Sequence, residues 1–135
     1  MRIESKLIYR TEMAKKFFVM GSVSAFLAVA LGAFAAHVLK DTLAADLFNI
    51  WEVAVRYHFY HALGLFVVAW AMTQWPGANF SAAGWLFVAG TIVFSGSLYV
   101  LSVTGLRWIG AITPIGGLCF LGGWFWLAWR MWISQ

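Results

Sequence analysis

The amino-acid sequence predicts an all-α protein, a transmembrane bundle of four helices, and three observations lead to this fold class. Of its 135 residues, 63% are hydrophobic and only 10% are charged, whereas a soluble domain carries about 25% charged residues. The apolar residues form runs of about 20, the length that an α-helix needs to cross a bilayer. Four such runs occupy about 80 positions, which leaves room for a single membrane domain.

The expected spans are residues 17–38, 56–75, 80–103 and 109–131, in a membrane domain 17–131 that follows a basic cytoplasmic segment, residues 1–16. The first span contains no Asp, Glu, Lys or Arg. The second helix is polar at its start and becomes continuously apolar from about Tyr57 to Trp75, where a Pro-Gly pair predicts a tight turn. A short turn at Arg107 separates the last two spans, and Pro114 is expected to bend the fourth.

The basic residues predict that both termini are cytoplasmic. With four spans, both termini lie on one side of the membrane, and that side holds Arg2, Lys6, Arg10, Lys15, Lys16 and Arg130. The opposite side holds Lys40, Arg56 and Arg107. Because Lys and Arg are enriched in cytoplasmic segments, we expect a multi-pass protein of the bacterial cytoplasmic (inner) membrane. A signal peptide is an alternative interpretation of residues 17–38, although this run is longer than a normal signal-peptide core.

Small residues are expected to hold the helices together, because helices in lipid associate by close packing and polar contacts. The first span has small residues at every fourth position: Ser24, Ala28, Gly32 and Ala36. Gly96, Gly116 and Gly117 are the expected positions of close approach in the last two spans. Tryptophans near the span ends, among them Trp51 and Trp124, are expected to anchor the protein at the membrane surfaces.

Polar residues of the spans are expected to gather at one depth, in the outer half of the membrane. This polar cluster contains His37, Tyr57, His61, Ser95, Ser97, Tyr99 and Thr113. One interpretation is a set of hydrogen bonds between helices. The other is a ligand site, because His58 and His61 share a helix face, and His37 could add a third nitrogen for a metal or, with His61, ligate haem.

The charges near the outer surface also allow two interpretations. Glu52 and Arg56 are four residues apart, which favours an ion pair, whereas Arg56 and Arg107 could instead bind an anionic lipid headgroup. Glu4 and Glu12 make the amino-terminal cluster a poor footprint for nucleic acid, so no nucleic-acid partner is expected. The sequence has no phosphate-binding loop, nucleophile elbow or carboxylate pair, so no catalytic residues are predicted.

Three segments resemble a known family. They are residues 31–37 (LGAFAAH), residues 57–65 (YHFYHALGL), and residues 94–99 (FSGSLY) followed by 112–117 (ITPIGG). Over residues 17–130 the chain is similar to the YgdD-like family of small membrane proteins of unknown function, found in bacterial inner membranes with relatives in animals. The resemblance implies a four-span helical protein and no established activity. The family pattern falls on His37, Tyr57, His61, Ser95, Gly96, Ser97, Tyr99, Thr113 and Pro114.

The resemblance also bears on the choice of histidines. The family has Gln at the position of His58, which favours His37 with His61 as the functional pair. Together, these features predict a non-enzymatic accessory, assembly or structural component of a membrane complex, without a cofactor, whose partners are the lipid bilayer and other membrane proteins or a second copy. The alternative is a small-molecule binder that holds haem, a metal or a quinone headgroup in an outer-leaflet polar pocket.

Overall fold

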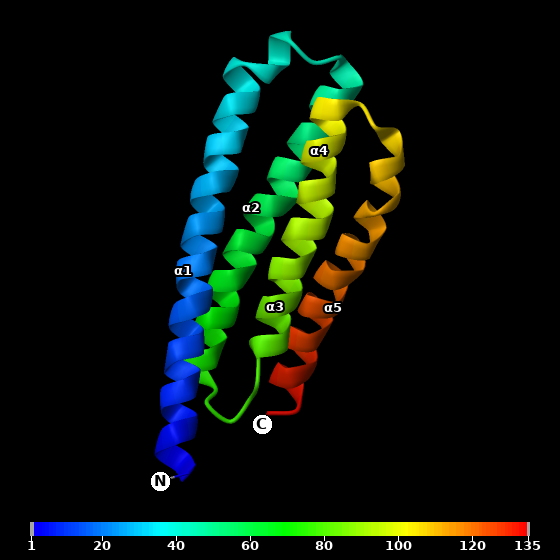
Figure 1. The fold of residues 1–135 in the computed structure, drawn as a ribbon. Coiled ribbons are helices and arrows are strands. Elements are labelled where there is room, and N and C mark those ends of the chain that lie inside the picture. The colour runs from blue at the N-terminus through cyan, green and yellow to red at the C-terminus, as the bar shows by residue number, and fades with distance from the viewer. Residues whose placement is uncertain (1, 135) are drawn as a thin grey trace.

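The computed structural model describes residues 2–134 as four antiparallel helical rods, with both ends of the chain at the same end of the bundle (Figure 1). The first two rods are α1 (Arg2–His37) and α2 (Ala45–Gln74), joined by the short 3-10 helix η1 (Leu39–Asp41). The third rod comprises α3 (Ser81–Gly90), the π-helix η2 (Thr91–Ser95) and α4 (Gly96–Thr104), and the fourth the 3-10 helix η3 (Arg107–Ala111) and α5 (Thr113–Trp132). The all-α prediction is confirmed.

Three of the rods contain segments long and apolar enough to cross a membrane: Leu7–His37, Ser81–Thr104 and Arg107–Trp132. They correspond to the first, third and fourth expected spans. The second expected span, on α2, does not reach the same apolar character, because α2 carries Asp46, Glu52 and Arg56 in its first half and both His58 and His61 in its middle. The two histidines are buried, so their side chains face protein, and only the other side of this part of α2 is exposed.

Helices α1 and α2 pack along a seam with a seven-residue repeat, which we call the heptad seam. On α2 it runs through Trp51, Val55, Ala62 and Leu65, which face Leu31, Gly32 and Gly21 of α1. On α1 it runs through the buried small residues Ala14, Gly21, Ala28 and Ala35. Such a repeat, 3.5 residues per turn, is typical of left-handed pairs of helices that cross at about 20°. The two backbones approach closely at Gly21, where an added Cβ would lie 3.1 Å from the carbonyl oxygen of Ala62.

The heptad seam differs from the small-residue face expected from the sequence. Ala28 is fully buried, but Ser24 and Gly32 are half-buried and Ala36 is exposed. A step of four residues rotates a position by about 40° around an α-helix, while a step of seven rotates it by only about 20°. A four-residue series therefore leaves the interface within a few turns, and a seven-residue series stays in it.

Two ends of helices also differ from expectation. Helix α1 is continuous across residues 16 and 17, so that the described part of the basic segment extends the first helix, and Met13, Ala14 and Phe17 are buried in the core. Pro114 lies in the first turn of α5, where its missing N–H costs no helical hydrogen bond. Pro114 therefore begins α5 instead of bending it.

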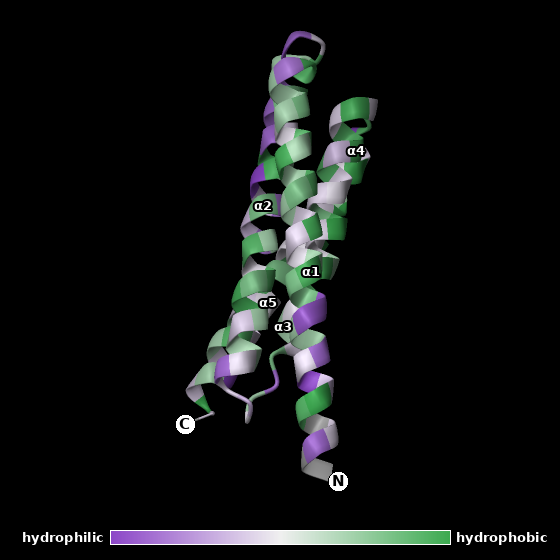
Figure 2. Cartoon of the chain, turned by 90° about the vertical axis from the view of Figure 1, so that its left-hand side faces the viewer, coloured by the Kyte–Doolittle hydropathy of each residue, from purple (hydrophilic) through white to green (hydrophobic). Residues whose placement is uncertain are grey.

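The outer surface of the bundle is strongly apolar. Hydrophilic residues gather at the lower end of α1, in the upper connection and along the upper part of α2, while apolar residues make up most of the other helical segments (Figure 2). Phe26, Ile92 and Leu118 are exposed by 72%, 68% and 68%. Contiguous apolar surface of this kind is rare on soluble proteins and is the normal surface of a helix in lipid.

Candidate functional site

The predicted polar residues form hydrogen bonds between rods at several levels of the bundle. The Ser95 hydroxyl donates to the Ala54 carbonyl oxygen at 2.9 Å, which links the π-helix η2 to α2. The hydroxyls of Ser97 and Thr113 lie 2.8 Å apart and link α4 to α5. Ser95 is fully buried and Ser97 nearly so. These contacts join the third rod to both of its neighbours.

His58 and Tyr99 form the next contact. The Nδ1 atom of His58 lies 3.2 Å from the Tyr99 hydroxyl, and the ring of Tyr99 packs at 4.6 Å from the ring of Trp51. The Trp51 indole N–H in turn donates to the Leu31 carbonyl oxygen at 3.1 Å. Trp51 is buried inside the bundle, although the sequence analysis assigned it to the membrane surface. This group of residues connects α1, α2 and α4.

His61 lies in a third group, between α2 and α5. Its Nδ1–H donates to the Tyr57 carbonyl oxygen at 2.8 Å, and its Nε2 accepts the Trp124 indole N–H at 3.2 Å. A carbonyl can only accept and an indole N–H can only donate, so these partners define a neutral imidazole with the proton on Nδ1. The ring also stacks on Phe120, with 3.4 Å between centroids and an interplanar angle of 6°. Both nitrogens and one ring face are thus occupied by the protein.

The structure separates His37 from His61. His37 is exposed at the end of α1. His61 lies next to Ala62, which is opposite Gly21 of α1. Gly21 and His37 are about 24 Å apart along α1, so the two histidines lie at different levels of the bundle. Within residues 2–134, no group of three or more His, Cys, Asp or Glu side chains could hold a metal ion. The histidine pair favoured by the family resemblance is therefore not assembled in this structure.

The polar groups also occupy more than one depth. Within the predicted cluster, the level of His61 is about 24 Å along α1 from His37, so these two residues do not share one layer. What these contacts share is a series of buried residues of α2, spaced by three and four positions: Trp51, Ala54, His58 and His61. This pattern was present in the sequence and would have identified Trp51 as an interior residue.

Glycines in the third and fourth rods play unequal roles in packing. At Gly116, an added Cβ would overlap the backbone nitrogen of Phe94 and lie 2.8 Å from its Cα. At Gly117 the nearest atoms belong to the Phe94 ring at 3.9 Å, and at Gly96 no atom lies within 4 Å. Of the three expected close-approach positions, only Gly116 brings two backbones together.

The charged residues near the upper end of the bundle form a different ion pair from the expected pair of Glu52 and Arg56. Arg107 Nη2 donates to Asp46 Oδ2 at 2.6 Å, an ion pair that joins η3 to the start of α2. The Arg107 hydrogen bond holds the pKa of the Asp46 carboxyl below its usual value. Glu52 and Arg56 form no ion pair with each other in the described residues. They line a separate pocket with Lys40.

A groove of about 610 Å³ lies between α1 and the third rod, with α2 as its floor. Its walls are apolar and include Leu27 of α1 and Ile92 of η2. Its polar lining residues are Ser24, His58, Thr91 and Tyr99, and of these His58 and Tyr99 contact each other. The volume is within the range of about 300–1,000 Å³ of small-molecule sites, which are mostly apolar with a few polar groups. This groove is the best candidate for a ligand site near the polar residues.

Comparison with known proteins places the chain in a family. Residues 31–117 match the profile of a family described as "Protein of unknown function (DUF423)". The chain belongs to this family. It is 49% identical over 111 residues to the "UPF0382 membrane protein YwdK" of Bacillus subtilis (strain 168). The aligned region covers 82% of this chain and 90% of the relative.

Further relatives have the same kind of name. The "UPF0382 membrane protein SH2409" of Staphylococcus haemolyticus is 43% identical over 113 residues, 84% of this chain and 92% of the relative. The "UPF0382 membrane protein SSP2132" of Staphylococcus saprophyticus is 44% identical over 113 residues, 84% of this chain and 93% of the relative. No solved structure matches the chain. The matches confirm a membrane protein family of unknown function under the DUF423 and UPF0382 names, and the YgdD-like name stays a prediction.

Proposed function

We propose that the chain is a four-span protein of the bacterial inner membrane with both termini in the cytoplasm. The antiparallel order of the rods supports four spans: if α1 and the third rod both cross the membrane upward in Figure 1, α2 must return the chain. The 30 residues of α2 correspond to about 45 Å of helix, more than the hydrocarbon core of about 30 Å. The excess of Lys and Arg at the end that carries the termini supports the orientation.

Cysteines placed at the two ends of α2 test this topology. In a Cys119→Ala background, we expect a membrane-impermeant maleimide to label Lys40→Cys in intact cells, and Gly77→Cys only after the membrane is permeabilised. Lys40 is exposed and an added Cβ at Gly77 meets no atom within 4 Å, so neither change should disturb the fold. Equal labelling of both sites in intact cells would contradict four spans, and the reverse pattern would contradict cytoplasmic termini.

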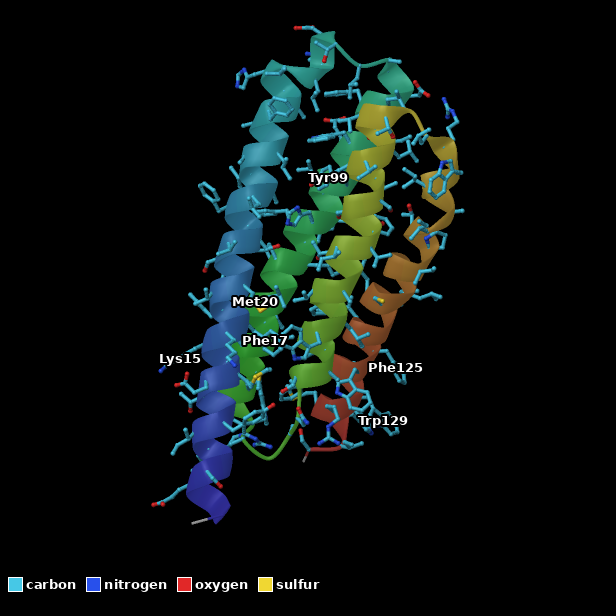
Figure 3. All side chains as sticks on the ribbon, in the orientation of Figure 1. Lys15, Phe17, Met20, Tyr99, Phe125 and Trp129 are labelled. Atoms are coloured by element: carbon cyan, nitrogen blue, oxygen red, sulfur yellow. The ribbon has the colours of Figure 1, made fainter. Side chains whose placement is uncertain are left out.

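Within the membrane, we propose a non-enzymatic accessory, assembly or structural role. The observation that supports it is that the interior polar groups have partners within the protein: among the side chains that the structure describes, every buried nitrogen or oxygen has a hydrogen-bond partner except Arg130 Nε. Few polar groups remain to act on a substrate. The outer apolar faces, such as that of α5 with Phe125 and Trp129 (Figure 3), are suited to contact another membrane protein or a second copy.

The groove beside His58 and Tyr99 favours a second candidate, a small-molecule binder. An apolar ligand with a carbonyl group, such as a quinone, could lie along Leu27 and Ile92 and accept a hydrogen bond from the Tyr99 hydroxyl. Haem or a metal held by both His37 and His61 is not part of this candidate, because the two side chains lie far apart.

Purification from native membranes in a mild detergent distinguishes the two candidates. For an accessory protein, native mass spectrometry is expected to show the chain bound to another protein or to a second copy, without a stoichiometric chromophore. For the binder, ultraviolet absorption and mass spectrometry should show a quinone that is lost in the Tyr99→Phe variant and kept in Tyr60→Phe, a tyrosine outside the groove. A stoichiometric metal or haem would contradict both candidates.

A further inference from the structure

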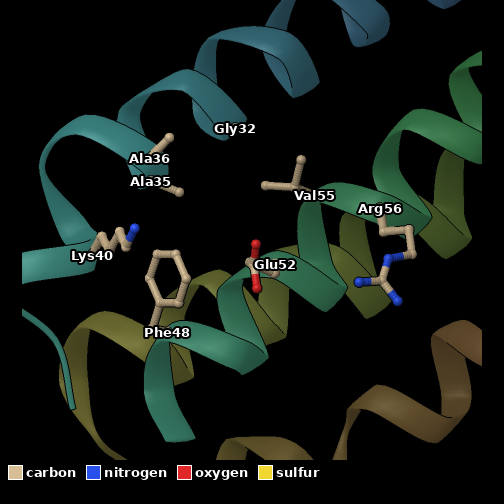
Figure 4. A pocket seen from close by; sticks show the side chains of 8 residues that line it. All are labelled: Gly32, Ala35, Ala36, Lys40, Phe48, Glu52, Val55 and Arg56. Carbon is tan, nitrogen blue, oxygen red and sulfur yellow. The ribbon is translucent and has the colours of Figure 1, made fainter. Parts of the chain in front are cut away.

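A charged pocket of about 430 Å³ lies where α1, η1 and α2 meet (Figure 4). Lys40, Glu52 and Arg56 line it, and in Figure 4 Glu52 lies between the two cations. All three side chains are exposed. In the described residues, neither Lys40 nor Arg56 approaches the Glu52 carboxylate within the 4.0 Å of an ion pair. The pocket therefore presents two separate positive charges and one negative charge to a ligand.

The nearby Asp46–Arg107 pair shows that these helices can form an ion pair where the side chains reach each other. Glu52 and Arg56 are also at the spacing that favours a pair on one helix. Glu52 and Arg56 nevertheless form no ion pair with each other in the part of the chain that the structure describes. A ligand with both a phosphate and an ammonium group matches this arrangement, since it satisfies all three side chains.

An apolar groove of about 340 Å³ continues from the charged pocket toward the middle of the bundle. The two share Gly32, Val55 and Arg56, so they form one continuous surface along α1 and α2. The rest of the groove is lined by Ala28, Val29, Ala33, Phe59 and Tyr60. Gly32 keeps the junction open, because an added Cβ there would lie 3.3 Å from the Val55 side chain. A polar head followed by an apolar trough has the shape of one lipid molecule.

We propose that this surface binds a phospholipid with a primary-amine headgroup, such as phosphatidylethanolamine. Lys40 and Arg56 hold the phosphate through charge-assisted hydrogen bonds. Glu52 accepts hydrogen bonds from the ammonium group, which a choline headgroup cannot donate. One acyl chain lies in the groove along Ala33 and Phe59. The assignment deepens the proposed function, because it rests on the membrane topology that puts this end of α2 at the headgroup level.

Native mass spectrometry of the full-length protein in micelles with defined lipids tests the proposal. We expect more retained phosphatidylethanolamine than phosphatidylcholine. Lys40→Gln and Arg56→Gln should each weaken retention about fivefold, the effect of one basic side chain at a headgroup. Glu52→Gln should weaken retention of phosphatidylethanolamine and not of phosphatidylglycerol, which has no amine. Ala33→Leu should weaken retention of all three lipids by filling the groove.

Matched controls make the same chemical changes at the opposite end of α1. Lys16→Gln and Glu12→Gln should leave lipid retention unchanged. Equal retention by Arg56→Gln and the unchanged protein would overturn the site, and equal retention of phosphatidylcholine and phosphatidylethanolamine would overturn the role of Glu52. Displacement of the lipid by an equal concentration of soluble phosphoethanolamine would overturn the role of the groove. Cysteine labelling at residues 40 and 77 reports on topology separately, so a failure of either idea can be recognised.

Discussion

Gly116→Ala is expected to destabilise the bundle by about 2 kcal/mol, because an extra methyl group forced against a packed backbone costs about 3 kcal/mol, the upper end of the range for overpacked cores. The added Cβ would meet backbone atoms of Phe94, and a backbone cannot turn aside as a flexible side chain can. Alanine gains about 1 kcal/mol over glycine in a helix interior, and this gain offsets only part of the clash. Thermal unfolding of the purified protein in one detergent measures the net effect.

Gly117→Ala is the matched control for this change. It lies one residue further along α5 and carries the same gain in helix propensity, but its nearest neighbour is the Phe94 ring at 3.9 Å. We expect this variant to be as stable as the unchanged protein or slightly more stable. If Gly116→Ala unfolded at the same temperature as Gly117→Ala, the close approach of α5 to η2 would be incorrect.

His61→Ala is expected to produce a loss of about 2–4 kcal/mol, comparable to other truncations of large buried side chains. The change removes the ring that stacks on Phe120 and the acceptor of the Trp124 N–H. In a lipid environment no water replaces the missing acceptor, so the indole N–H would lose its hydrogen bond outright. Thermal unfolding and the emission wavelength of the tryptophans measure the loss and the change around Trp124.

Two further variants identify the cause of that loss. His37→Ala is the matched control, and we expect no change in stability because His37 is exposed at the end of α1. His61→Gln should recover part of the stability, since an amide oxygen can accept from Trp124 but cannot stack on Phe120. Equal effects of His37→Ala and His61→Ala would show that His61 does not link α2 to α5.

The heptad seam shows how far a sequence can predict packing in this protein. The repeat of Ala14, Gly21, Ala28 and Ala35 is visible in the sequence, but so is a four-residue series of small residues. Both spacings are used by helices in membranes. Without the partner helix, the sequence does not state which side of α1 is covered, and the exposed Ala36 belongs to the series that the fold does not use.

At the candidate site, too, the sequence predicted some contacts correctly and missed others. Ser95, Ser97, Tyr99 and Thr113 were predicted to make contacts between helices, and each hydroxyl has a polar partner in the structure. His37 was grouped with His61 from its expected depth and from the family resemblance. Depth along a helix can be read from the sequence, but the direction in which a side chain points depends on how the helices are rotated against one another.

The sequence by itself determined that the chain is helical and apolar enough for lipid, because segment length and hydropathy are properties of each segment alone. Only the tertiary structure decided which histidine is enclosed, which glycine admits a neighbouring backbone, and which charges remain apart beside an apolar groove. These outcomes depend on the register and rotation of neighbouring helices. Both are set by contacts between residues distant in the chain, such as Trp51 with Leu31 and His61 with Trp124.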